Sequence, residues 1–219
     1  MPLSAAAQDG EARKAKTLLH LQSKGVPFTP SLPARQEEAD ALRRADLEIA
    51  ERAIALLIVS GRGSHRDDGE ARALIAEFAA KDLFSGVEGR YMADANPADK
   101  DHFNMSWRFE GLHVLLWALG FHENLGNPDS VANENDLMNA LRALGPDGLR
   151  AKAKPRAQAE LLDAADLMYR YDWACVDALN SGTAGPAGIN CEVILEWRYA
   201  LEWLTAAPAQ DWDDVNMDT

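Results

Sequence analysis

The fold is decided by the stretch from residue 96 to residue 120, which reads NPADKDHFNMSWRFEGLHVLLWALG. Asn96 and Pro97 are typical of a helix cap and first turn, and Gly120 is typical of a helix end, so we predict one helix over residues 97–119. Its apolar side chains form two opposite faces: Leu112, Leu115, Leu116 and Leu119 on one, and Phe103, Trp107, Val114, Trp117 and Phe121 on the other. A helix that is apolar on two sides is usually covered on both. We therefore expect it to be central and buried.

Helical spacing also marks the flanking sequence, over residues 11–24, 36–60, 67–81, 134–144, 155–179 and 186–205. Gly25 and Gly61 are expected to end the first two of these helices, and Asp67 with Asp68 to cap the third. No stretch alternates with period two for long enough to indicate a strand. The sequence therefore predicts an all-α fold: a single compact domain over residues 11–219, a disordered N-terminus at 1–10, and an acidic tail at 208–219 held by Trp212.

Charge and cysteine content limit the classes of function. The 22 lysines and arginines against 35 aspartates and glutamates give a formal net charge of -13, which would repel nucleic acid and anionic membranes. No apolar run approaches the ~20 residues of a membrane-spanning helix, and the first ten residues lack the pattern of a signal peptide. Cys175 and Cys191 could pair, but two cysteines do not indicate a disulfide framework. We expect a reduced, cytoplasmic protein with Cys175 as a core residue.

Metal and nucleophile motifs are incomplete. Glu110 and His113 form an i,i+3 pair that is half of a di-iron motif in helical bundles. Asp99 and His102 form a second pair, but it lies roughly 16 Å away along the helix axis, too far to share a metal centre. Ser64 and Ser181 lack the G-x-S-x-G context of a catalytic nucleophile. The sequence therefore predicts neither a metal site nor a bound cofactor.

Charged residues within apolar helix faces are the stronger candidates for a site: Arg108, Glu110, Asp172 and Glu196. An unpaired buried charge is costly, so we expect Arg108 to pair with Asp172 or Glu196. Three carboxylates for one arginine imply a raised carboxylate pKa, a bound cation, or a second base such as Arg198 or Arg52. By contrast, Asp166 and Arg170 have the i,i+4 spacing of an ordinary surface pair. An ion-pair network with a purely structural role is the favoured explanation.

The sequence resembles one known family along nearly its whole length. The matching blocks, in order, are Gly25-Val26-Pro27, Leu32-Pro33, residues 48–53, Trp107-Arg108-Phe109-Glu110, residues 115–120, residues 163–174, residues 196–204 and Trp212-Asp213-Asp214-Val215. They are similar to the domain of unknown function 4272 family. The resemblance implies no established activity, cofactor or catalytic residue. Asp172 stands where the family's Tyr-Arg-Tyr-His-Trp block has a histidine, which disfavours invariant proton chemistry at this position.

These observations favour a cytoplasmic helical binding or interaction module, with an acidic surface suited to a basic protein partner. One alternative is a hydrolase that uses Glu110, Asp172 or Glu196 as acid or base beside Arg108 in a pocket between helices. Another is a structural protein whose internal charges only fix the register of its helices. We expect a monomer or homodimer that binds neither nucleic acid nor membranes.

Overall fold

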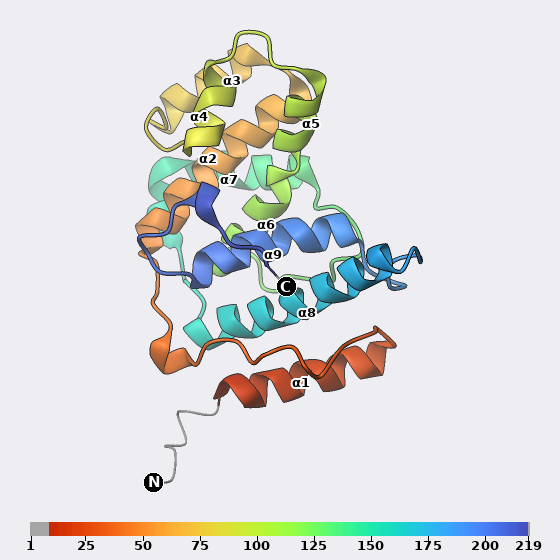
Figure 1. Ribbon diagram of the computed structural model, residues 1–219. Helices are drawn as coiled ribbons and strands as arrows, with labels where there is room; N and C mark the ends of the chain where they lie inside the picture. Colours follow the sequence, from red (N-terminus) through yellow and green to blue (C-terminus); the bar gives the residue numbers. More distant parts are fainter. Residues whose placement is uncertain (1–8, 219) are drawn as a thin grey trace.

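The computed structural model describes residues 9–218, which contain helices and no strands, so the predicted all-α class is confirmed (Figure 1). Most of the segment predicted to be a disordered N-terminus, residues 1–8, lies outside this range, and the first helix begins at Asp9. The elements are α1 (Asp9–Lys24), η2 (Glu38–Asp40), α2 (Asp46–His65), α3 (Asp68–Glu77), α4 (Gly86–Ala93), α5 (Asp99–Ser106), α6 (Arg108–Ala118), α7 (Glu134–Lys152), α8 (Gln158–Asn180), α9 (Cys191–Thr205) and η3 (Trp212–Asp214).

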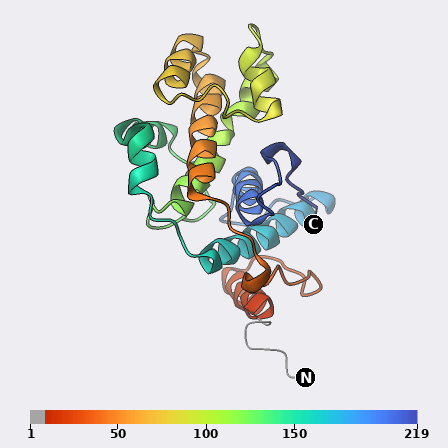
Figure 2. The ribbon, with the colours of Figure 1, turned by 90° about the vertical axis from the view of Figure 1, so that its left-hand side faces the viewer.

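Helix α2 runs through the middle of the molecule, and Figure 2 shows other helices on several sides of it. Every residue from Ala53 to Gly63 is buried, because α3, α5, α6 and α7 all contact this helix. The prediction that α2 ends at Gly61 is wrong. At Gly63 a Cβ would lie 2.6 Å from the backbone nitrogen of Ser106, so the glycine permits the close approach of α5.

The predicted central helix over residues 97–119 is divided at Trp107 into α5 and α6, which corrects its continuity. The turn tightens there, and the Glu110 N–H bonds the Trp107 carbonyl three residues earlier at 3.0 Å. Helix α6 is buried on nearly all sides, as expected for the central segment, whereas α5 leaves Phe103 62% exposed. The centre of the fold is thus shared by α6 and α2.

Helices α1, α8 and α9 form successive layers beneath α6, with α1 on α8, α8 beside α9, and α9 against α6 (Figure 1). A disulfide between Cys175 of α8 and Cys191 of α9 joins two of these layers. Cys175 is buried, as predicted, but the expectation of reduced thiols is wrong. The two cysteines can pair only because the C-terminal part of α8 lies beside the start of α9, and this contact cannot be read from the sequence.

The C-terminal segment folds back over α2 and α9. Trp212 is 2% exposed, and its carbonyl accepts a hydrogen bond of 2.5 Å from the Tyr199 hydroxyl. Buried Arg44 donates to three carbonyls of this segment, those of Ala207, Pro208 and Gln210. The segment is therefore fixed by buried polar contacts as well as by packing. Within residues 9–218, no helix is long and apolar enough to cross a membrane.

Candidate functional site

Three consecutive residues of α9, of which Glu196 is the first, bond the other three side chains that the sequence singles out. Glu196 pairs with Arg108, the Trp197 indole bonds Glu110, and Arg198 pairs with Asp172. Neighbouring residues of a helix point in different directions, about 100° apart. The four predicted residues therefore lie around one turn of α9 without facing a common space.

The Arg108–Glu196 pair confirms that Arg108 has a carboxylate partner. Their Nη1 and Oε2 atoms lie 3.0 Å apart, and both side chains are partly buried between α6 and α9. Burial raises the pKa of Glu196 above its ordinary value, although the charge of Arg108 and its hydrogen bond act in the opposite direction. The Arg108 guanidinium also lies 5.3 Å from the centre of the Tyr199 ring. These contacts bring α6 and α9 together.

The other buried ion pairs hold segments of the chain together. Asp172 pairs with Arg198, the second base expected from the sequence, and this guanidinium also donates to the Asp218 carbonyl at 2.8 Å. Asp166 and Arg170 are paired at 2.9 Å, but both are almost fully buried, so their predicted surface position is wrong. Arg170 also donates to a carbonyl of the 25–45 connection, which holds that segment over α8.

Glu110 differs from every other buried carboxylate of residues 9–218. Four acidic side chains are buried there, and three have an arginine partner: Glu88 with Arg52, Asp166 with Arg170 and Asp172 with Arg198. Glu110 is 3% exposed and has no ion-pair partner among the described residues. Its negative charge is therefore not balanced by a positive side chain of the fold.

Neutral N–H groups hold the Glu110 carboxylate in place. Trp197 Nε1 donates to Oε2 at 2.7 Å, and the Ala132 backbone nitrogen donates to Oε1 at 2.7 Å. An ionised carboxylate has about four acceptor positions, so about two remain available. The indole is itself positioned by a stack in which the His113 ring lies 5.3 Å from Trp197 and 5.1 Å from His122. Glu110 is thus fixed in one orientation with spare acceptor capacity.

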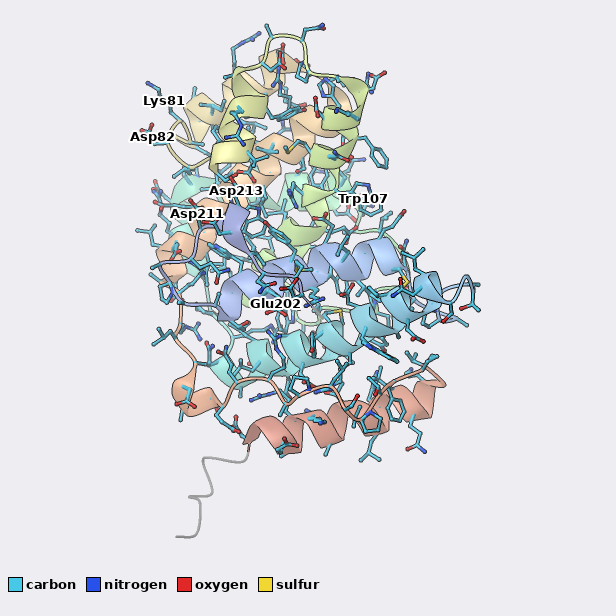
Figure 3. All side chains as sticks on the ribbon, viewed as in Figure 1. Lys81, Asp82, Trp107, Glu202, Asp211 and Asp213 are labelled. Carbon is cyan, nitrogen blue, oxygen red and sulfur yellow. A yellow bond between two sulfur atoms is a disulfide. The ribbon has the colours of Figure 1, made fainter. Side chains whose placement is uncertain are left out.

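A surface cavity of about 210 Å³ adjoins Glu110, between α5, α6 and the start of α7. Three aromatic residues, Phe103, Trp107 and Phe109, contribute to its lining. The Phe103 and Trp107 rings meet at 81° with centroids 6.3 Å apart, which makes two sides of a corner. Figure 3 shows Trp107 at the edge of the molecule, away from the acidic C-terminal residues Asp211 and Asp213. Three of the nine lining residues are therefore aromatic, and Glu110 is one of the two acidic ones.

A second carboxylate and an exposed apolar residue complete the cavity. Glu134 Oε1 lies 2.7 Å from Nε2 of His65, and Val131 is 59% exposed. Of five surface cavities that we compared, this one alone includes any of the four predicted residues in its lining. A ligand in this cavity would meet Glu110 but not Arg108, Asp172 or Glu196.

The i,i+3 pair of Glu110 and His113 does not converge on a metal. His113 Nε2 bonds the Leu125 carbonyl at 2.9 Å, while Glu110 bonds Trp197 and Ala132. No cluster of three or more histidine, cysteine, aspartate or glutamate side chains within residues 9–218 could hold a metal ion. Glu110 and His113 therefore bond different partners.

Sequence reasoning found Glu110 but missed most of the cavity around it. Phe103 and Trp107 were assigned to a buried face, and no local pattern pointed to Val131 or Glu134. Both of these belong to the segment that returns from α6 to α7, whose Ala132 reaches back to Glu110. The available signal was the excess of carboxylates over arginines among the internal charges, for which a bound cation was one explanation.

Comparison with known proteins gives a family but no activity. The family model described as Domain of unknown function (DUF4272) matches residues 13–215 of the 219 residues. No curated protein matches the chain, and no solved structure does. The match confirms the resemblance noted in the sequence and extends over almost the whole chain, from α1 to the residue that follows η3. The chain therefore belongs to the DUF4272 family.

Proposed function

We propose that this protein is a binding module that receives a positively charged group of a partner protein in the cavity at Glu110. The observation that carries the proposal is the buried carboxylate of Glu110, which has no ion-pair partner within residues 9–218. Isolated buried charges are strongly disfavoured, and a carboxylate in such a position is stabilised by a cation. A bound ligand would supply that cation.

The size and lining of the cavity support a side chain as the bound group. A volume of about 210 Å³ is smaller than the 300–1,000 Å³ typical of pockets that enclose a drug-sized ligand. Phe103 and Val131 are 62% and 59% exposed at the cavity. Exposed apolar residues beside a charged pocket are typical of surfaces that bind proteins, because they contact the apolar stem of a long cationic side chain.

The overall charge supports a basic partner. A net charge of -13 attracts positively charged surfaces at long range and increases the rate of encounter. Long-range attraction does not determine which group is bound, because surface carboxylates are spread over many elements. The cavity at Glu110 would provide that selectivity.

A peptide titration tests the proposal. The probe is a glycine-lysine peptide, and its fully acetylated form is the neutral control. We expect the lysine peptide to bind the native protein and the acetylated one not to bind. In Glu110→Gln the affinity should fall about tenfold or more, corresponding to a loss of about 1.4 kcal/mol. Glu77→Gln makes the same charge change at an exposed residue of α3 and should stay within about twofold of the native affinity.

The outcome that contradicts the proposal is an equal affinity of the native protein and Glu110→Gln for the lysine peptide. That result would mean that general surface charge accounts for the binding. Intact folding of Glu110→Gln is checked by its amide NMR spectrum, so that loss of binding is not mistaken for loss of structure.

A cytoplasmic location is retained as part of the proposal. The Cys175–Cys191 disulfide counts against it, because disulfides persist mainly in oxidising compartments. Trapping free thiols at cell lysis decides the matter. Two alkylated cysteines are expected in a reducing cytoplasm, and none if the protein resides in an oxidising compartment.

A further inference from the structure

Resting on the proposed function, we infer that the group bound at Glu110 is a methylated ammonium, tertiary or quaternary, in preference to a primary ammonium or a guanidinium. The chemistry of the cavity wall leads to this choice. The cavity combines the Glu110 carboxylate, which has no ion-pair partner within residues 9–218, with three aromatic residues. A carboxylate beside aromatic rings favours a cation that is weakly hydrated and that contacts the rings through methyl groups.

The aromatic rings are free of the protein's own cations. Elsewhere in residues 9–218 the arginines lie over aromatic rings: Arg44 over Trp203 at 4.0 Å, for example, and Arg156 over Trp117 at 4.7 Å. No such contact is made to Phe103, Trp107 or Phe109. A cation within about 6 Å of a ring centre is attracted to the face of the ring, and quaternary ammonium groups are commonly bound in this way.

The hydration of the cation distinguishes the candidates. A primary ammonium is a compact, strongly hydrated charge, so it loses more hydration than a methylated ammonium does when it lies against aromatic rings. The lining also offers acceptors for N–H groups, namely the carboxylates of Glu110 and Glu134 and the hydroxyls of Ser64 and Ser106. The preference for a methylated cation therefore rests on the aromatic rings.

The corner between the rings suits the shape of such a cation. Two rings that meet at 81° present surfaces in two directions, and Phe109 adds a third aromatic residue from the first turn of α6. A tetrahedral ammonium with methyl groups can contact several walls at once, whereas a planar guanidinium is best matched by a single ring face or a carboxylate edge. The Glu110 carboxylate in the lining then selects the cation over a neutral group of equal shape.

The experiment compares four small probes that share a hydroxyethyl arm or its equivalent. They are choline, ethanolamine, 2-hydroxyethylguanidine and 3,3-dimethylbutan-1-ol, the last being a neutral isostere of choline. Binding to the full chain is followed by NMR at the Trp107 indole and at backbone amides around the cavity. We expect choline to bind at least fivefold more tightly than each of the other three. Glu110→Gln and Phe103→Ala should each abolish this preference.

Two matched variants control for nonspecific effects. Leu19 on α1 is 67% exposed, close to the 62% of Phe103, so Leu19→Ala removes a comparable apolar side chain far along the sequence from the cavity. Glu77→Gln repeats the charge change of Glu110→Gln at an exposed position. Both variants should keep the native preference for choline. Because Phe103 is largely exposed, Phe103→Ala should fold normally. This variant therefore keeps the test informative even if Glu110→Gln fails to fold.

The outcomes separate this inference from the proposed function. Ethanolamine or 2-hydroxyethylguanidine binding as tightly as choline would overturn the inference and leave a cation site intact. If the neutral isostere binds as tightly as choline, or if no cation binds, both the inference and the proposed function are overturned. A peptide carrying trimethyllysine then identifies the source of the group. Affinity at least tenfold above that of choline supports a modified partner protein, and affinity equal to or below that of choline supports a small quaternary ammonium molecule.

Discussion

Replacing Glu110 by glutamine should change the stability of the free protein very little, although the residue is almost fully buried. Glutamine keeps one oxygen acceptor, so one of the two N–H groups that now bond Glu110, from Trp197 or Ala132, loses its partner at a cost of about 1–3 kcal/mol. Removing an unbalanced buried charge gives back a desolvation penalty of several kcal/mol. The two effects oppose each other, and we expect a net change within about 1 kcal/mol of zero.

The matched comparison is Asp166→Asn, which removes a charge from a balanced pair. Arg170 is 1% exposed and would remain in the core without its carboxylate partner. Breaking a buried pair in this way costs about 3–5 kcal/mol. The difference between the two variants should therefore exceed about 2 kcal/mol, although both replace a buried carboxylate by its amide.

Urea unfolding at neutral pH measures this difference, with each variant's unfolding midpoint compared at an unchanged slope. Glu77→Gln, at an exposed position, sets the baseline for a change of one charge. If Glu110→Gln proves as destabilising as Asp166→Asn, the charge of Glu110 is balanced within the fold. The reasoning that assigns a cationic ligand to it would then be refuted.

Three further predictions concern the scaffold. The Cys175–Cys191 disulfide closes a sequence separation of 16 residues, so replacing both cysteines by serine should cost about 3 kcal/mol of stability. Calorimetry should show a Tm lowered by roughly 6–12 °C. A reductant should lower the Tm of the native protein by the same amount and leave the Tm of the variant unchanged. Burial and a neighbouring histidine lower the pKa of His122 below 6.5, so the folded state binds fewer protons than the unfolded chain. The free energy of unfolding should therefore fall as the pH drops below about 6.5, and it should fall less steeply in His122→Gln. Gly63→Ala would place a Cβ 2.6 Å from the backbone of Ser106 and should cost about 1–3 kcal/mol in urea unfolding, whereas Gly89→Ala, with no atom within 4 Å, should cost less than that.

The helical class follows from local sequence because periodic apolar faces and glycine or proline stops are properties of single helices. The pairing of Arg108 with a carboxylate could also be expected, since a charge on an apolar face needs a partner wherever the helix packs. The same reasoning fails for Asp166 and Arg170. An i,i+4 pair has the same spacing on a surface as in a core, and only the packing of the 25–45 connection over α8 buries it.

The cavity at Glu110 depends on contacts between distant parts of the chain, which no local pattern records. Phe103 comes from α5, Glu110 from α6 and Val131 from the segment before α7, and all three line the cavity. The disulfide has the same origin, since Cys175 and Cys191 meet only when α8 and α9 lie side by side. Both features require tertiary packing that the sequence alone does not reveal.

The central claim is that the aromatic cavity at Glu110 holds a cation, and intermolecular NOEs test it most directly. With choline at saturating concentration, we predict NOEs from its methyl protons to the ring protons of Phe103 and Trp107 in the native protein. The same NOEs should be absent in Glu110→Gln under identical conditions. NOEs that persist in Glu110→Gln, or that arise only from residues outside this cavity, would contradict the claim.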